Sequence, residues 1–195
     1  MILEITVVLA TLSLVRAKDA TYELIISDSA LVTTCKEAAP GRLDIDGFMD
    51  LSEISTTLKE NGVVLAGNIT FVWDIQPQDR IKAVIKLLYL DRGTWTPTFY
   101  TVTSNDFCKS MYDSRLPWHT YWLRHVTNYE DVKDKCISPG TKLILETYLL
   151  RSTMTMPKIR EGFYKVQCTY QAFDVNGTER PTSACFEVYG DLQQF

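Results

Sequence analysis

Short runs of alternating apolar and polar residues dominate the chain, and a period of two predicts β-strands because successive side chains point to opposite faces. The clearest run is residues 63–75, which sets one face of Ile69, Phe71, Trp73 and Ile75 against another of Asn68, Thr70, Val72 and Asp74. Further strands are predicted over residues 22–27, within 44–58, and over 81–90, 95–102, 143–150, 163–175 and 186–189.

One segment, residues 104–134, departs from this alternation. Trp118, Tyr121, Trp122 and His125 stand at positions i, i+3, i+4 and i+7, which is helical spacing. Pro117 suits the first turn of such a helix. We therefore expect a mostly β protein, with two antiparallel sheets forming a sandwich or cup and one or two short helices lying across them.

The last two long strands are predicted to form a hairpin around Asn176-Gly177, a pair favoured in two-residue type I′ turns. In that register Val175 pairs with Thr178. Cys168 then lies opposite Cys185 at a non-hydrogen-bonded pair, where side chains approach most closely. A cross-strand disulfide is therefore conceivable.

Residues 153–162 lie between two predicted strands and are expected to form a loop. Met154, Met156 and Ile159 flank Pro157, and Lys158 and Arg160 stand beside them. An apolar loop with a basic fringe could dip into a lipid surface or gate a pocket mouth. It could equally be tucked under the sheet.

The start of the chain suits a secretory signal peptide over residues 1–17. Its apolar run, residues 5–15, is shorter than the ~20 residues that cross a membrane. Val15-Arg16-Ala17 gives small residues at alternate positions, as a cleavage site does. Residues 18–195 contain no repeat or linker and are expected to form a single domain. The mature chain should therefore be secreted and extracellular.

Cysteines and glycosylation motifs agree with this compartment. The chain has five cysteines, and an odd number leaves at least one unpaired. Acceptor triplets for N-glycosylation begin at Asn68 and Asn176, which predicts a glycoprotein.

The sequence contains few residues or motifs that could support catalysis. His119 and His125, six positions apart, do not share a helix face well, and no nucleophile motif, phosphate-binding glycine loop or C-x-x-C pair is present. We therefore expect no enzyme, no metal site and no cofactor. The net charge is −4 without a block of like charge, which argues against nucleic acid as a partner.

The chain is rich in bulky apolar side chains. They could fill an ordinary core or line a ligand cavity, and sequence alone does not separate the two. The residues predicted to line such a cavity are Ile69, Phe71, Trp73, Ile85, Leu87, Tyr89, Trp95, Phe99, Phe107, Met111, Trp118, Trp122, Leu145, Met154, Met156, Tyr164 and Val166.

Several motifs occur together in a characteristic order. They are LAGNITF, IKAVIKLLYL, the spacing from SNDFC to DKCISPGT, and the run from PKIREGFYKV through AFDVNG to CFEVYG. From about Asn68 onward this order resembles the GM2 activator protein family and, more closely, the insect chemosensory A and B proteins. The resemblance implies a β-cup whose splayed sheets hold a lipid.

The resemblance also implies particular residues and partners. It pairs Cys35 with Cys185 and Cys108 with Cys136, and it leaves Cys168 as a free thiol, in preference to the cross-strand pair of the hairpin. The implied ligand is a long-chain lipid or hydrocarbon, such as a cuticular hydrocarbon pheromone, and the implied partner is a chemosensory receptor or channel. The alternative is a secreted interaction module with a filled core that contacts a receptor or extracellular partner.

Overall fold

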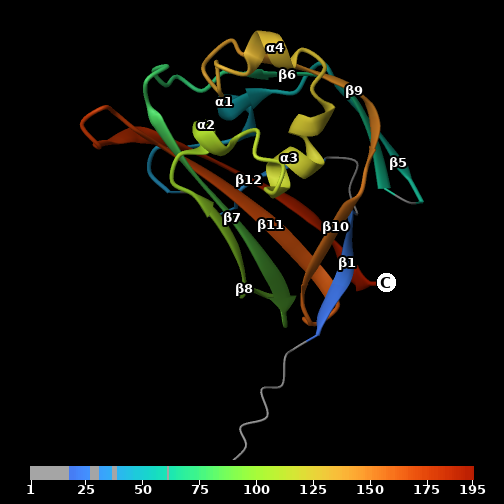
Figure 1. The fold of residues 1–195 in the computed structure, drawn as a ribbon. Coiled ribbons are helices and arrows are strands. Elements are labelled where there is room, and N and C mark those ends of the chain that lie inside the picture. The colour runs from blue at the N-terminus through green and yellow to red at the C-terminus, as the bar shows by residue number, and fades with distance from the viewer. Residues whose placement is uncertain (1–17, 27–30, 37–38, 61) are drawn as a thin grey trace, which may run out of the picture.

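The protein is mostly β, with two antiparallel sheets and a few short helices, as the computed structural model in Figure 1 shows. The structure describes residues 18–26, 31–36, 39–60 and 62–195. The predicted signal peptide, residues 1–17, lies outside them. The predicted fold class is confirmed.

The larger sheet, sheet A, curls into a half-barrel. In spatial order it contains β10 (Ser152–Pro157), β1 (Asp19–Ile26), β12 (Glu179–Gln194), β11 (Gly162–Phe173), β7 (Arg80–Asp91) and β8 (Thr94–Ser104). Two short strands, β2 (Thr33–Thr34) and β3 (Arg42–Leu43), also pair with β12, and the β3 pairing is parallel.

The smaller sheet, sheet B, is built around β6 (Gly62–Phe71). β4 (Met49–Asp50), β5 (Ile54–Lys59) and β9 (Lys142–Leu150) all pair antiparallel with β6. Only Arg151 separates β9 from β10, so this stretch of chain passes from sheet B directly to the edge of sheet A. The two sheets are therefore joined along one side (Figure 1).

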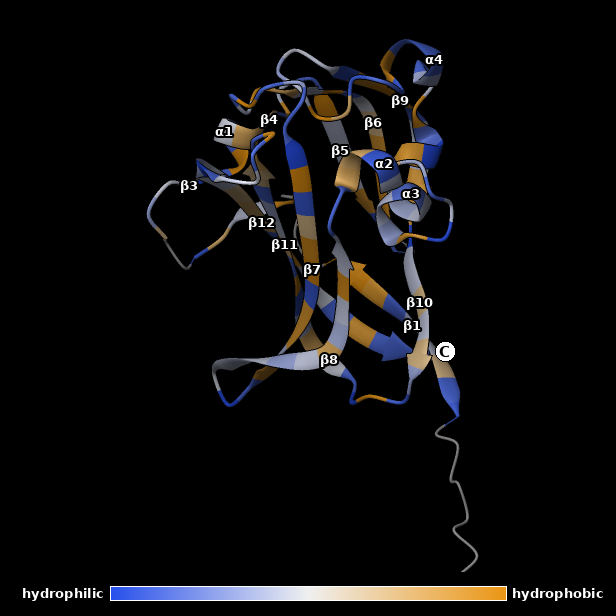
Figure 2. Cartoon of the chain, turned by 60° about the vertical axis from the view of Figure 1, so that its left-hand side comes forward, coloured by the Kyte–Doolittle hydropathy of each residue, from blue (hydrophilic) through white to orange (hydrophobic). Residues whose placement is uncertain are grey.

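The predicted faces of the strands are confirmed where alternation was clearest. Ile69, Phe71 and Trp73 are at most 4 % exposed, whereas Asp74 is exposed. Figure 2 shows the same alternation as bands of hydrophobic and hydrophilic residues along β7. One face of each sheet is thus apolar and turned toward the other sheet.

Aromatic rings fill the space between the sheets at the end where α1 (Ile45–Phe48) lies. The Phe48 ring centroid is 4.9 Å from that of Tyr170 on sheet A and 5.6 Å from that of Phe71 on sheet B. Along β7, the inward residue Ile81 belongs to this fully buried region. The sheets are closely packed together at this end.

The helical segment was predicted in the right place but with too few helices. It contains α2 (Phe107–Ser110), α3 (Pro117–Tyr121), the 3₁₀ turn η1 (Leu123–His125) and α4 (Tyr129–Val132). Pro117 opens α3 as expected. No helix within the described ranges is long and apolar enough to cross a membrane.

The predicted two-residue turn at Asn176-Gly177 is wrong. The backbone N–H of Asp174 donates to the Thr178 carbonyl at 2.9 Å, which closes a three-residue loop, and Gly177 adopts a φ of 82°. The loop is therefore a type I turn followed by a glycine in the left-handed conformation. The Asp174 carboxylate stabilises it by accepting hydrogen bonds from the backbone N–H groups of Asn176 and Thr178.

The longer loop and an irregularity between Gln171 and Phe173 change the strand register. Cys168 lies opposite Phe186, and Cys185 lies opposite Thr169. The cross-strand Cys168–Cys185 pair is therefore excluded, because neighbouring positions on the two strands point to opposite faces.

The predicted loop over residues 153–162 is wrong for its first half, which forms β10. Met154 pairs with Tyr22 and Met156 with Ala20 of β1, so Met156 is 2 % exposed. The following turn is fixed by the Tyr22 hydroxyl, which donates to the Ile159 carbonyl and accepts from the Ile159 N–H, each at 2.9 Å. β10 is therefore an edge strand of sheet A, and the turn that follows it is held by the Tyr22 side chain.

Candidate functional site

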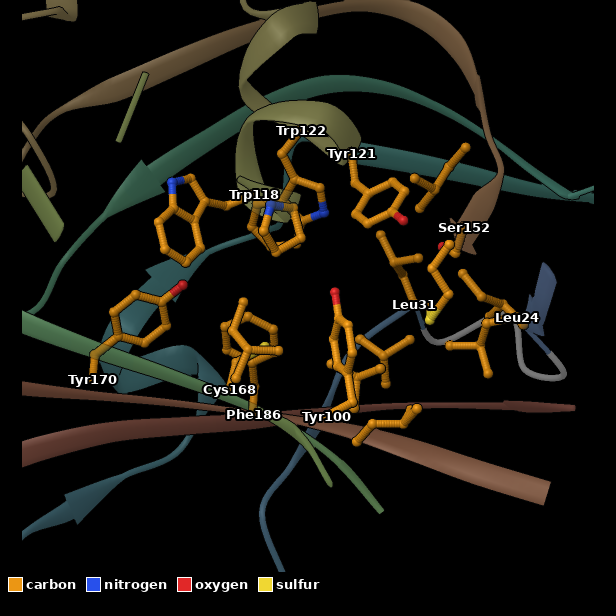
Figure 3. A pocket seen from close by; sticks show the side chains of 18 residues that line it. Leu24, Leu31, Tyr100, Trp118, Tyr121, Trp122, Ser152, Cys168, Tyr170 and Phe186 are labelled. Carbon is orange, nitrogen blue, oxygen red and sulfur yellow. The ribbon is translucent and has the colours of Figure 1, made fainter. Parts of the chain in front are cut away.

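A cavity lies between the concave face of sheet A and helix α3 (Figure 3). Its volume is about 110 Å³. A single water molecule needs only about 10–15 Å³ of such space, and packed cores contain few larger voids. The described residues that line it are Leu24, Ile26, Leu31, Ile85, Leu87, Tyr100, Pro117, Trp118, Tyr121, Trp122, Leu150, Ser152, Met154, Val166, Cys168, Tyr170, Phe186 and Val188.

Helix α3 is held over the cavity by hydrogen bonds at both ends. The Trp118 indole N–H donates to the Ser110 carbonyl at 3.0 Å. The Tyr121 hydroxyl donates to the Thr153 carbonyl of β10, and the Tyr148 hydroxyl donates to the Tyr121 carbonyl at 3.0 Å. These contacts hold the aromatic residues of α3 at a distance from the concave face of sheet A.

A second cavity of about 180 Å³ adjoins the first on the side of sheet B. Trp122 and Leu31 border both cavities. The Trp122 ring lies nearly parallel to that of Phe186, with centroids 5.9 Å apart. The Trp122 indole therefore forms part of the partition between the two hollow spaces.

The wall of the first cavity carries no Lys, Arg, His, Asp or Glu among the described residues that line it. Its polar groups are three phenols, two indole N–H groups, one serine and one thiol. Burial raises the pKa of Tyr121 to about 12 and that of Tyr170 well above its usual value. The wall is thus uncharged at physiological pH and suits an apolar or weakly polar ligand.

The structure brings together only part of the predicted lining. Ile85, Leu87, Trp118, Trp122, Met154 and Val166 border the first cavity, and Ile69 and Leu145 border the second. The remaining inward residues pack instead into filled regions: Phe71, Trp73, Phe107 and Met111 in the main core, and Tyr89, Met156 and Tyr164 in a smaller cluster beside β1 and β10.

Two predicted lining residues, Trp95 and Phe99, lie on the wrong face of sheet A. Trp95 contacts Phe163 and Tyr189, with ring centroids 6.0 and 5.6 Å away, and lies 4.9 Å from the Lys165 ammonium. Phe99 is 60 % exposed. Along β8 the even-numbered residues face inward, so Tyr100, rather than Phe99, borders the cavity.

Other lining residues were missed although their strands were predicted. Leu24 and Ile26 alternate along β1, and Phe186 and Val188 alternate along β12. Their period of two was a usable signal. The sequence did not show that β1 and β12 are neighbouring strands of sheet A, which places these four residues together under the cavity.

Two disulfides join Cys35 to Cys185 and Cys108 to Cys136, the pairing that the resemblance implied. The first ties the segment after β2 to β12, and the second ties α2 to the chain that follows α4. Cys168 is a free thiol, 6 % exposed, in the cavity wall.

Cys168 is expected to resist alkylation in the folded protein, because burial raises the pKa of its thiol to about 12 and the thiolate is the reactive form. Iodoacetamide at neutral pH should label no cysteine in the native state. In denaturant without reductant it should label one, and peptide mapping should place the label on Cys168. A label on Cys35 would contradict the disulfide assignment.

The two glycosylation motifs lie in different surroundings. Asn176 is exposed in the hairpin turn. Asn68 is half-buried in β6, and its side-chain amide donates to the Glu53 carboxylate at 2.6 Å. Glycosylation of either residue stays a prediction.

The histidines are engaged in packing or lie at the surface of the helical segment. His125 stacks on Tyr148, with ring centroids 3.6 Å apart, and its Nδ1 is 2.7 Å from Glu146 Oε1. Within the described part of the chain, no three His, Cys, Asp or Glu side chains gather as metal ligands.

Two sequence comparisons found no relative of this chain. No protein-family model matches the chain, and no curated protein sequence matches it. The relation to the GM2 activator and insect chemosensory A and B proteins therefore stays an expectation from the motifs alone.

Proposed function

We propose that this protein is a secreted, non-enzymatic carrier of apolar lipid ligands. The ligand is a long-chain lipid or hydrocarbon, part of whose chain lies between sheet A and α3; a cavity of about 110 Å³ is smaller than the ~150 Å³ that holds one benzene, so the rest of the chain extends beyond it. The motif order shared with insect chemosensory A and B proteins extends the proposal to chemosensation, in which the carrier presents cuticular hydrocarbons to a receptor or channel. Two disulfides fit the oxidising compartment that a secreted carrier occupies.

The observation that carries the proposal is the uncharged cavity beneath α3. A concave, mostly apolar site with a few polar groups is the usual form of a small-molecule site. Each CH₂ of a ligand buried there would contribute ~0.8 kcal/mol, so a chain needs few polar contacts to bind. A filled-core interaction module, the competing interpretation, requires no such hollow.

The direct test is to identify what the protein carries. Protein purified from its native tissue, or from a secreting host, should yield a long-chain lipid in near-stoichiometric amount when extracted with organic solvent and analysed by mass spectrometry. Delipidated protein should then take up a neutral fluorescent lipid probe, such as a labelled fatty-acid methyl ester. Consistent absence of extractable lipid, together with failure to bind the probe, would favour the interaction module.

Filling the cavity should remove binding without unfolding the protein. Val166 is half-buried on β11 and borders the cavity, so Val166→Phe places a phenyl ring in the space of two or three ligand CH₂ groups. We expect probe affinity to fall by about 2 kcal/mol, roughly 30-fold. Fluorescence titration of the delipidated variant measures this change.

The matched control is Lys86→Phe. Lys86 is exposed on the opposite face of β7 and does not border the cavity, so the same ring is added outside it. Probe affinity should stay within twofold of wild type. If both variants bind as wild type does, the probe occupies another site and the cavity is not the binding site.

A further inference from the structure

Tyr170 is the most buried residue in the cavity wall whose hydroxyl has no hydrogen-bond partner among the described residues. Tyr170 is 6 % exposed and borders the cavity, and among the described residues no group forms a hydrogen bond with its hydroxyl. Figure 3 shows this hydroxyl at one end of the cavity, beyond Cys168. Because this hydroxyl retains accessible surface and faces the cavity, its partner has to be a molecule in the cavity, either water or a ligand.

The surroundings restrict the chemistry of that partner. The Tyr170 ring is fixed, because it contacts Phe48 at 4.9 Å and Phe107 at 5.3 Å between centroids. The phenol stays protonated, since burial holds its pKa well above the usual value, and it can therefore donate. No cationic side chain among the described residues borders the cavity, so a carboxylate would be buried without a counter-charge.

We propose that the cavity selects neutral long-chain lipids that carry a hydrogen-bond acceptor, a ketone, aldehyde or ester carbonyl, and that the Tyr170 hydroxyl donates to this oxygen. This inference rests on the proposed carrier function and narrows its ligand class. A saturated hydrocarbon would fit the apolar wall but would leave the Tyr170 hydroxyl unpaired. A fatty acid would bind in its protonated form or weakly.

A second phenol in the same cavity provides a matched comparison. The hydroxyl of Tyr100, on β8, also has no hydrogen-bond partner within the described ranges, but Tyr100 is only half-buried. The Tyr100 hydroxyl points into the same cavity from the edge strand of sheet A, but its side chain is less buried than that of Tyr170. The same Tyr→Phe change at the two positions therefore separates a selective contact from a general loss of polarity.

The experiment compares two chains of equal length in competition. Delipidated protein is equilibrated with methyl tridecyl ketone and n-pentadecane, and the bound molecules are extracted and quantified by gas chromatography. Tyr170→Phe should lower the bound ketone-to-alkane ratio about two- to tenfold relative to wild type, since a neutral hydrogen bond contributes ~0.5–1.5 kcal/mol. Tyr100→Phe should change this ratio less than twofold. Pentadecanoic acid at neutral pH should compete poorly with the ketone.

Stability provides an independent readout. Because Tyr170→Phe removes a hydroxyl without a partner, the ligand-free variant should unfold at no lower urea concentration than wild type. A clearly lower midpoint would mean that the hydroxyl is already satisfied, and would overturn the inference.

The outcomes distinguish this inference from the carrier proposal. If neither ketone nor alkane is bound by wild type, the carrier proposal itself fails. If both are bound and Tyr170→Phe leaves their ratio unchanged, the carrier stands and the selectivity assigned to Tyr170 is wrong. A ratio that falls in Tyr100→Phe but not in Tyr170→Phe would also overturn the assignment.

Discussion

Replacing Trp73 with alanine is expected to lower the free energy of unfolding by about 3–5 kcal/mol, the usual cost of truncating a core aromatic residue. Trp73 is 0 % exposed, packs against Phe48 at 5.8 Å between centroids, and donates its indole N–H to the Thr182 hydroxyl at 3.0 Å. Urea denaturation of the delipidated variant measures this loss. Affinity for the neutral lipid probe, expressed per folded molecule, should be unchanged because Trp73 does not border the cavity.

Trp122→Ala is the matched control. It removes the same side chain from the partition between the two cavities, where Trp122 is only half-buried. This variant should alter probe affinity and should cost less stability than Trp73→Ala. If instead Trp73→Ala weakens the probe and keeps its stability, the ligand reaches the Phe48 end of the molecule and the cavity is assigned wrongly.

Trp73 also shows that the sequence predicts which residues face inward but not which of them line a cavity. Alternation places Ile69, Phe71 and Trp73 correctly on the inner face, because a strand with one wet face and one buried face has a strong period of two. It does not say whether an inner residue meets another side chain or empty space. On β7, Ile81 packs in the core and Ile85 borders the cavity, although both are isoleucines on the same face.

The difference between core and cavity is a tertiary property. It depends on how far α3 stands above sheet A, and that distance is set by hydrogen bonds between distant parts of the chain, such as Tyr121 to Thr153. Local sequence carries no record of these contacts. Most of the residues predicted to line the cavity therefore face inward. Some of them border one of the two cavities, and the others pack in the filled cores.

The errors on the edge strands have a related cause. β10 ends in a proline, and this segment was interpreted as a loop although residues 153–156 alternate between threonine and methionine; pairing with β1 makes it a strand. β8 is aromatic on both faces, so its alternation does not say which face turns inward; the pairing with β7 decides that Tyr100 faces inward and Phe99 outward. Edge strands are commonly irregular, and their side chains are specified by pairing rather than by periodicity.

Removing the Cys35–Cys185 disulfide is expected to be the most destabilising change of all. The bond closes a loop with a sequence separation of 150 residues. In the chain-entropy account such a crosslink stabilises the native state by about 5 kcal/mol, because it restricts the unfolded chain. The double variant Cys35→Ala/Cys185→Ala should therefore lose about a third or more of the stability of a typical domain, which is ~5–15 kcal/mol. Urea denaturation under non-reducing conditions measures the loss.

The second disulfide provides an internal control for this explanation. Cys108 and Cys136 are separated by 28 residues, so Cys108→Ala/Cys136→Ala should cost about 1.5 kcal/mol less than the first double variant. Equal losses, or the reverse order, would mean that local packing around the sulfurs outweighs loop closure. The first bond has a further role in either case. Cys35 follows Leu31, which borders both cavities, so anchoring this segment to β12 also fixes part of the cavity wall.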